Sequence, residues 1–503
     1  MDRVEINRGV RLMKIELLLA LPCSDPSSLE KRLKRVPVLT RRKSTHQNLY
    51  EVYFDTPDQI LHDKGVTLLI RRVGSAHSQH WLQTLTAGDR GCSALSQHRE
   101  WTLPVPSACL ALAVLKTTPW ASIDPDGTVF DALVPSFVTS FKRTSWSVHW
   151  RDGSVIEVAL DMGRIMAGKK STPICELALK LLSGQSAALF DLGQRIACTV
   201  AVMPVSQSKV ERGFAMAMGR LESPLAATSH KLAADLSLNA AAVCVLREMF
   251  CHFTTNLNTL HTSNDPEVVH QARIGWRRFK SALRLFKPVF AVDTMPDWQM
   301  LKPLLRLLSE LRDLDVACTD TLPALADTYA EGDARREGLW RVMTHSLRNA
   351  ANSKRKSVLH AMDEPSVGAT LLAATQWLEG LAALTESREA NVGAKESLRR
   401  WSQRRINRLH RQLQLARNVV SCPASQHRVR ILAKRVRYDI ESLRSLLPKK
   451  HAKRWYRQAT SLQLNLGVER DVRQASALVA KLEGDPGLAE FLRGVGCGKA
   501  SQV

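Results

Sequence analysis

The sequence predicts an α+β protein of two domains. The first is an antiparallel β domain with flanking helices, and the second is an all-α bundle of two pseudo-symmetric helical repeats. Three observations predict this fold class. Short apolar runs with two-residue alternation, the period of a half-buried strand, fill residues 13–215. From about residue 230 onward the apolar residues recur at helical spacing. A basic motif then occurs twice in this second part, about 157 positions apart.

The length of 503 residues suits two domains that each bury a core. We predict domains at 13–215 and 229–487, joined by a linker at 216–228. The linker overlaps a stretch that contains Gly, Pro and Ser, at 219–229.

The predicted strands of the first domain lie at 14–21, 66–73, 81–86, 100–105, 145–150, 155–161 and 175–181. Asp152-Gly153 stands between two of them and favours a tight hairpin turn. Two helices are predicted beside the strands, one at 26–34 with Ser27 or Ser28 as N-cap and one at 187–200. The domain is therefore predicted to be antiparallel with helical additions.

The second domain is predicted to be helical. Leu301, Leu304, Leu308 and Leu311 recur at the three- and four-residue spacing of a buried helix face, and a strongly basic helix is predicted at 398–417. A leucine-rich helix that ends in an acidic-basic turn, with Arg-Asp in both copies, is predicted after each copy of the basic motif, at 308–315 and 464–471. We interpret this half as two bundle units that face each other about a pseudo-twofold axis.

The basic motif reads His-x-x-Arg-Ile-x-x-Arg/Lys-Arg-x-Arg/Lys at 270–280 and again at 427–437. At about 100° per residue, the His and the cations three, seven and ten positions later share one helix face. Like charges at these spacings repel one another. Because the sequence nevertheless contains two such basic helix faces, we predict that they bind an anion. The candidate binding residues are His270, Arg273, Arg277, Arg278, Lys280 and Arg284 in the first stripe, and His427, Arg430, Lys434, Arg435 and Arg437 in the second stripe.

The chain carries a net charge of +23, and the part after residue 220 holds 43 basic against 28 acidic residues. Such a field attracts polyanions without selecting one. The ten cysteines contain no CxxC pair, which favours small buried residues in a reducing compartment over zinc ligands. No stretch reads as a signal peptide or as long enough to span a bilayer. We therefore expect a cytoplasmic protein with no membrane partner.

The second domain resembles the CHAD family, conserved-histidine α-helical domains known for binding inorganic polyphosphate. Four segments carry the resemblance in family order: VHQARIGWRRFKSALRLF, LRDLDV, HRVRILAKRVRYDIESL and LQLNLGVERD. The resemblance covers roughly residues 228–485. It implies that the two stripes line one shared basic groove, with His270 and His427 as hydrogen-bond donors to phosphate. It also makes polyphosphate granules a candidate location.

The first domain resembles the CYTH family, the triphosphate tunnel metalloenzymes, over roughly residues 13–214. The segments that carry this resemblance are KIELLLALP, YFDTP, GVTLLIRRVG, HWLQTLTAG, IEVALDMG, ICELALKLLSG and SKVERGF. The resemblance implies an antiparallel β-tunnel that uses Mg²⁺ or Mn²⁺ to hydrolyse inorganic triphosphate. Chains of this family begin close to the first strand, which makes Met13 a candidate start besides Met1.

Several tunnel positions depart from the family's pattern. The opening Glu-x-Glu-x-Lys reads Lys14, Glu16 and Leu18, the Arg-x-Arg reads Leu69 and Arg71, the lysine of QTLK is Thr86, the Arg-x-Glu-x-Glu reads His98, Glu100 and Thr102, and the closing Glu-x-Glu-x-Glu reads Glu176, Ala178 and Lys180. Hard cations need oxygen ligands, and phosphoryl transfer needs cations beside the phosphate. We therefore expect metal binding and hydrolysis to be weak or lost.

The tunnel residues that remain as candidates are Glu16, Arg71, Arg72, Glu100, Arg143, Lys209 and Arg212, with Glu157, Asp161 and Glu176 as weak candidates for metal ligands. The function that the sequence favours is binding of inorganic polyphosphate, or of another polyphosphorylated anion, with no cofactor required.

Two alternatives stay open. The first is an active inorganic triphosphatase that uses Mg²⁺ or Mn²⁺, which release of phosphate from tripolyphosphate would reveal. The second is a nucleic-acid binder, which competition between polyphosphate and duplex would reveal. The second is less favoured, because tryptophans such as Trp276 and Trp401 do not alternate with the basic residues as single-strand binders require.

Overall fold

The computed structural model describes residues 12–22, 26–75, 78–88, 91–228, 231–290, 294–389, 397–418, 423–482 and 484–500. They form two compact units. Unit 1 comprises Met1–Ser223 and Asp363–Gln376, and unit 2 comprises Pro224–Met362 and Trp377–Val503. The boundary at Ser223 lies inside the predicted linker. Asp363–Gln376, in contrast, comes from the part of the chain that the sequence assigned to the helical domain.

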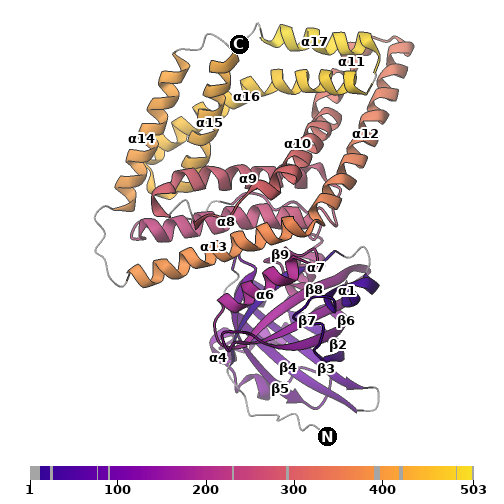
Figure 1. Ribbon diagram of the computed structural model, residues 1–503, viewed down its shortest axis with the longest axis vertical. Helices are drawn as coiled ribbons and strands as arrows, with labels where there is room; N and C mark the ends of the chain where they lie inside the picture. The colour runs from indigo at the N-terminus through magenta and orange to yellow at the C-terminus, as the bar shows by residue number, and fades with distance from the viewer. Residues whose placement is uncertain are drawn as a thin grey trace. The chain divides into compact units, whose positions relative to one another are not determined.

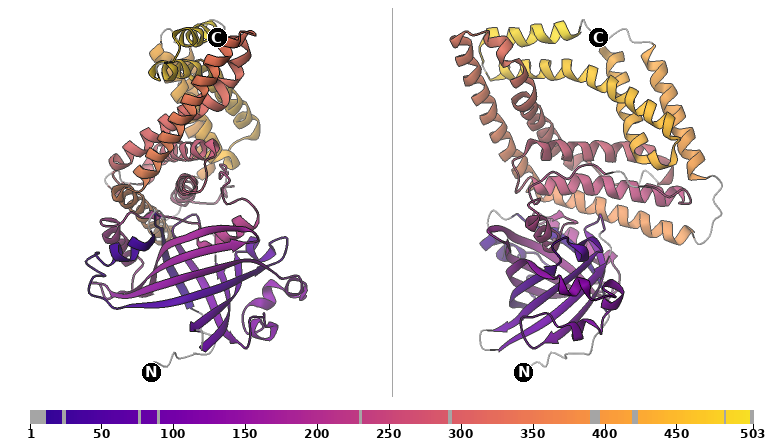
Figure 2. Two further views of the ribbon diagram at one scale, coloured as in Figure 1. Left: turned by 90° about the vertical axis from the view of Figure 1, so that its right-hand side faces the viewer. Right: turned by 180° about the vertical axis from the view of Figure 1, so that it is seen from behind.

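Unit 1 contains an eight-stranded antiparallel barrel, whose strands curve around a common interior (Figures 1 and 2). The strand order is β5-β4-β3-β2-β6-β7-β8-β1, and pairing of β1 with β5 closes the barrel. The strands are β1 (Leu12–Ala20), β2 (Ser44–Asp55), β3 (Val66–Ser75), β4 (Ser78–Gly88), β5 (Leu95–Val105), β6 (Val134–His149), β7 (Val155–Ala167), β8 (Lys170–Ser183) and the short β9 (Met203–Pro204), which also pairs with β1.

The structure confirms the predicted fold class and all seven predicted strands, and it adds β2 and the short β9. The first half of β2 is polar and exposed, which hides the strand period there, and only the second half alternates in burial. Asp152-Gly153 makes the predicted hairpin turn between β6 and β7. Gly153 has a φ of 87°, a conformation that glycine adopts without steric cost.

The main hydrophobic core of unit 1 lies outside the barrel wall. Leu17 and Leu19 of β1 and Leu177 and Leu179 of β8 are fully buried in one cluster with residues of α1 (Pro26–Leu33) and α6 (Ala187–Ala197). Since side chains alternate along a strand, the residues between these leucines point into the barrel. The remaining helices of this unit are α2 (Ile60–Asp63), α3 (Leu112–Leu115), α4 (Trp120–Ile123), α5 (Thr128–Asp131) and α7 (Lys209–Ala217).

Unit 2 is a set of long helices (Figure 1). They are α8 (Leu238–Thr259), α9 (Pro266–Leu285), α10 (Lys302–Val316), α11 (Ala326–Ala330), α12 (Ala334–Met362), α14 (Leu398–Arg417), α15 (Pro423–Leu443), α16 (Lys449–Lys481) and α17 (Pro486–Ala500). A π-helical turn, Ala317–Thr321, follows α10. Gly275 lets α9 approach α8 closely, because a Cβ there would lie 2.7 Å from the backbone nitrogen of Phe253.

Helix α13 (Pro365–Glu389) is long and apolar enough to cross a membrane over Pro365–Thr385. We expected no stretch long enough to span a bilayer, and the length and composition of α13 show that this expectation is wrong. Half of the stretch is buried inside the protein, however, and Leu371, Leu372 and Ala374 are fully buried. A core helix of a soluble protein can have the same length and apolar composition, so these properties are weak evidence for a membrane span.

Candidate functional site

The interior of the barrel holds a cavity of about 370 Å³. Its lining comes mainly from inward positions of the strands and from the start of α7. Polar residues that line it include Lys14, Glu16, Arg71, Thr84, Thr86, Glu100, Arg143, Glu176, Lys180 and Lys209. Five of the seven predicted tunnel candidates line this cavity: Glu16, Arg71, Glu100, Arg143 and Lys209. Of the three predicted metal-ligand positions, Glu176 lines it, while Glu157 and Asp161 pair with the lining residues Lys180 and Lys209.

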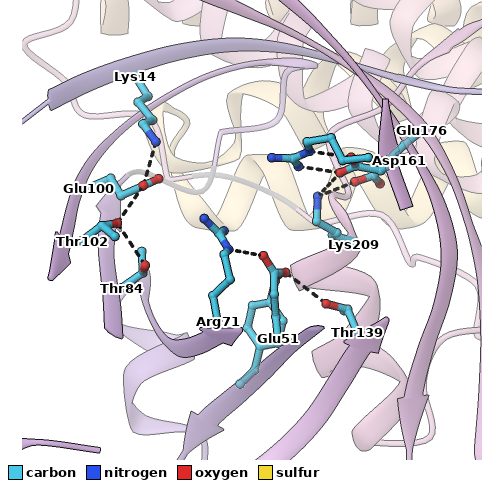
Figure 3. A network of polar contacts seen from close by, with 12 residues as sticks. Lys14, Glu51, Arg71, Thr84, Glu100, Thr102, Thr139, Asp161, Glu176 and Lys209 are labelled. Carbon is cyan, nitrogen blue, oxygen red and sulfur yellow. Dashed lines mark hydrogen bonds and ion pairs between the residues drawn. The ribbon is translucent and has the colours of Figure 1, made fainter. Parts of the chain in front are cut away.

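Lys209 belongs to a cluster of charged side chains at one side of this cavity (Figure 3). Its Nζ atom lies 2.9 Å from Oδ2 of Asp161 and 2.9 Å from Oε1 of Glu176. Arg143 donates two hydrogen bonds to Asp161, from Nε and Nη2, each of 2.7 Å. Burial raises the pKa of Asp161, but Lys209 and Arg143 outweigh this effect and hold it far below its ordinary value.

Glu51 is a buried tunnel residue that the sequence prediction missed. It accepts hydrogen bonds from Arg71 Nε at 2.7 Å, from the Tyr53 hydroxyl at 2.6 Å and from Thr139 at 3.0 Å. Burial raises the pKa of Glu51, but Arg71 and then Lys209 outweigh this effect and lower the pKa to about 2. Its position two residues before the tyrosine of YFDTP, on the same strand face, is the signal that could have identified it.

Two lysines that replace family acids form ion pairs with neighbouring carboxylates. Lys14 Nζ lies 2.7 Å from Oε1 of Glu100, which also accepts a hydrogen bond of 3.0 Å from Thr102 (Figure 3). Lys180 Nζ lies 3.5 Å from Oε2 of Glu157, across β8 and β7. Each substitution therefore places a side-chain cation beside an acid that remains.

The described donor set of the tunnel does not fit a divalent metal ion. Mg²⁺ and Mn²⁺ need several oxygen ligands, whereas Asp161 and Glu176 are held by Lys209 and Glu157 is held by Lys180. In the part of the chain that the structure describes, no group of three or more His, Cys, Asp and Glu side chains could hold a metal ion.

Two predicted tunnel candidates do not line the cavity. Arg72 alternates with Arg71 on β3 and lies with its guanidinium 5.1 Å from the ring centre of Tyr50, its register partner on β2. Arg212 lies one turn after the start of α7 and donates a hydrogen bond to the carbonyl oxygen of Pro173. Arg72 does not line the cavity because side chains alternate along a strand. Arg212 does not line it because successive residues of a helix point in different directions around its axis.

Unit 2 contains a cavity of about 570 Å³ between α9, α10 and α15. The structure brings both stripes to this cavity, although they are far apart in the sequence. Its basic lining residues are Arg273, Arg277, Lys280 and Arg284 from α9, Lys302 and Arg306 from α10, and Lys434 and Arg435 from α15. None of the described residues that line it is acidic. We call it the α9–α15 cavity.

Burial, and then repulsion between neighbouring cations, lowers the pKa values of basic groups in this cavity. Burial and the neighbouring Arg277 lower the pKa of Arg273 to about 10. Burial, Arg277 and Arg430 lower the pKa of Lys434 to about 7. The pKa of Lys280 also falls, because of burial and Arg284. An anion in the cavity would relieve this repulsion.

Other members of the stripes point elsewhere. Arg278 is almost fully buried, lies 3.9 Å from Glu248 and 3.7 Å from Glu441, and donates to the carbonyl oxygen of Thr228. Arg437 lies 3.6 Å from Glu441. These two residues were predicted to bind phosphate, and the structure places them in ion pairs on the neighbouring helix face.

Three more stripe residues do not line the cavity or cannot be placed. Burial and Arg312 lower the pKa of His270, which lies one turn before Arg273. Arg430 is half-buried, and burial and Arg470 lower its pKa. The side chain of His427 lies outside the described residues. The sequence prediction missed Lys302 and Arg306, because they stand on α10 and not in the repeated basic motif.

Comparisons with known proteins find two successive domains in the chain. The model of the CYTH domain matches residues 24–214, and the model of the CHAD domain matches residues 244–480. An inorganic triphosphatase of Haemophilus influenzae is 32% identical over 210 residues, which are 41% of this chain and 55% of that protein. The match therefore spans about half the length of this relative.

Two solved structures are also similar. The CHAD domain from the plant Ricinus communis is 26% identical, covers 56% of this chain and 92% of its own, and gives a TM-score of 0.47. A Hippeastrum protein reported to have a dominant triphosphatase activity is 16% identical, covers 42% of this chain and 97% of its own, and gives a TM-score of 0.30.

Proposed function

Because this chain is a two-domain CYTH–CHAD protein, we propose that it binds inorganic polyphosphate in the α9–α15 cavity. We also propose that its tunnel hydrolyses triphosphate weakly or not at all. The observation that carries the first proposal is the meeting of both stripes in a cavity whose described lining holds eight cations and no acid.

The chemistry of the lining suits a flexible chain of phosphates. Arginine presents a planar fork of donors that matches two phosphate oxygens, whereas lysine acts as a compact point charge. The row from Arg273 to Arg284 comprises twelve residues of α9, whose ends lie about 17 Å apart along the helix. Successive phosphates of one chain would therefore meet successive cations, and release of their counterions would add to the affinity.

The ion pairs of the tunnel support the second proposal. A tunnel triphosphatase needs carboxylates that are available to a metal and cations that are available to phosphate. Here Lys209 pairs with Asp161 and Glu176, and Lys14 pairs with Glu100. The chain's own cations thus neutralise the acids that a metal would need.

An active triphosphatase is the second candidate function, because the Haemophilus influenzae relative is an inorganic triphosphatase. Mg²⁺ or Mn²⁺ would be required for that activity, whereas polyphosphate binding requires no cofactor. Arg71, whose guanidinium points into the cavity, would remain to contact phosphate (Figure 3). We further propose a cytoplasmic location at polyphosphate granules, where the anion is concentrated.

The test is a polyphosphate pull-down paired with a triphosphatase assay on one preparation of the full-length protein. We expect retention on polyphosphate beads and phosphate release from tripolyphosphate close to background with Mg²⁺ or Mn²⁺. Strong hydrolysis without retention would favour the triphosphatase. Equal displacement by duplex DNA at matched phosphate concentration would favour a general nucleic-acid binder.

A further inference from the structure

A second cationic surface lies on α14, outside the α9–α15 cavity. This helix contains seven arginines and no acidic residue. Arg400, Arg404, Arg408 and Arg411 are exposed and fall within about 80° of one another around the helix axis. The opposite face is buried through Leu398, Ser402, Ile406, Leu409 and Leu413. We call the exposed side the α14 arginine face.

One flank of α14 is attached to the end of the α9–α15 cavity. Arg405 donates a hydrogen bond of 3.3 Å to the carbonyl oxygen of Arg284, and Arg284 lines that cavity. The ring of Trp401 stacks on Phe286 just beyond the end of α9, with ring centres 5.6 Å apart. These contacts, made by residues that flank the α14 arginine face, place α14 beside the end of α9, where Arg284 stands.

The other flank of α14 packs on the start of α16. His410 stacks on Trp455 with ring centres 4.2 Å apart, and Gln414 donates to Gln458 at 3.2 Å. The first twenty residues of α16 add Lys449, Lys450, Lys453, Arg454 and Arg457 and contain no acidic residue. Both tryptophan rings, Trp401 and Trp455, are engaged in packing, so they do not offer the stacking platforms on which nucleic-acid bases rest.

We propose that the α14 arginine face is a second phosphate-binding segment, over which a long polyphosphate chain continues after it passes Arg284. This inference rests on the proposed function of the α9–α15 cavity. The face lacks acidic neighbours on its own helix and lies beside a second basic segment, so it suits a continuous polyanion. The affinity should then rise with chain length, because longer chains displace more counterions.

The test compares two ligands on the full-length protein by isothermal titration calorimetry. One is a polyphosphate no longer than the row from Arg273 to Arg284, about 17 Å, and the other is long-chain polyphosphate. The variant is Arg400→Gln, Arg408→Gln and Arg411→Gln. We expect it to bind the long chain roughly tenfold more weakly, with a salt-dependence slope smaller by about two. The affinity for the short chain should not change, which also shows that the variant is folded.

The matched control is Arg335→Gln, Arg341→Gln and Arg348→Gln, three exposed cations of α12. It removes the same charge and should leave both affinities unchanged. Equal weakening by the control, or equal weakening of both ligands by the α14 variant, would overturn the inference. So would an unchanged long-chain affinity, or a loss that affects only duplex DNA or RNA. Absence of binding of either polyphosphate to the wild-type protein would instead refute the proposed function.

Discussion

The Nζ atom of Lys209, the first residue of α7, lies 2.9 Å from Oδ2 of Asp161 on β7. Asp161 is fully buried and also receives two hydrogen bonds from Arg143. Two side-chain cations therefore pair with this fully buried carboxylate. Asp161 is therefore held by cations of the chain itself, which supports the proposal of a weakly active or inactive tunnel.

Replacing Lys209 by alanine should destabilise unit 1. The change leaves Glu176 without its cation and Asp161 with only one, and breaking a buried pair costs about 3–5 kcal/mol. We expect a lower melting temperature in thermal unfolding, with partial recovery on addition of Mn²⁺, which can stand between the two carboxylates. The control is Arg212→Ala on the same helix, which should change stability far less. A variant as stable as the wild type would contradict the role of the pair.

Glu51 predicts a stability change at acid pH. Its pKa is lowered from 4.5 to about 2 in the folded protein, so its contribution is present above pH 4.5 and is lost as the pH falls through 2. The shift corresponds to roughly 3 kcal/mol. The difference in unfolding free energy between wild type and Glu51→Gln should therefore shrink as the pH falls from 5 to about 2. A difference that stays constant over this range would show that Arg71 does not stabilise the ionised form.

Restoring the family's residues should recover part of a hydrolytic activity. The variant carries Lys14→Glu, Leu18→Lys, Thr86→Lys, Ala178→Glu and Lys180→Glu. Leu18 and Ala178 are register partners on β1 and β8, so the new lysine and glutamate would face each other. Losing one transition-state contact can cost about 10²–10³ in rate, and we expect the wild-type protein to release phosphate near background.

The measurement for this variant is phosphate release from tripolyphosphate, with and without Mn²⁺, beside a thermal melt that shows folding. A folded variant with no metal-dependent gain would mean that other positions limit the tunnel. Rapid hydrolysis by the wild-type protein would contradict the degenerate tunnel and support the triphosphatase.

Lys434 should make polyphosphate binding depend on pH. Its pKa is lowered to about 7 by burial and by Arg277, Arg430, Arg470 and Arg437 from three helices. A bound polyanion raises the pKa of Lys434. The contribution of the Lys434 charge to the affinity is therefore complete below pH 7, and it is lost as the pH rises through the pKa that Lys434 has in the complex. We expect roughly tenfold weaker binding at pH 8.5 than at pH 6.5.

The informative variant is Lys434→Arg, because arginine stays charged over this range. It should remove most of the pH dependence in calorimetric titrations while it keeps binding. A variant with the same pH profile as the wild type would assign the dependence to other groups, such as Lys280 or the phosphate chain.

The sequence predicted the architecture well because period-two and helical patterns are local properties of the chain. One strand that it missed, β2, shows its alternation only in the half around Tyr53. The assignment of Asp363–Gln376 to unit 1 could not be predicted. Leu372, in the middle of a helical pattern, packs in the core that contains Leu17 and Leu179, and such a contact depends on tertiary structure.

Neighbouring residues of one predicted stripe lie in different surroundings in the structure. Arg273 and Arg277 line the α9–α15 cavity, whereas Arg278, adjacent to Arg277, is buried between two glutamates. Both residues belong to the motif, so the sequence alone does not distinguish them. Their different environments arise from the packing of α8 and α15 against α9. Glu51 was missed for a similar reason, because its partner Arg71 stands on another strand.

The central claim is that both stripes hold one polyphosphate chain, and titration of the full-length protein with long-chain polyphosphate tests it most directly. The variants are Arg277→Gln with Lys280→Gln, and Lys434→Gln with Arg435→Gln, two cavity cations from each stripe. Because charge-assisted hydrogen bonds contribute roughly 1.5–3 kcal/mol each, both variants should weaken binding by several kcal/mol. Wild-type affinity in either variant would contradict the shared site.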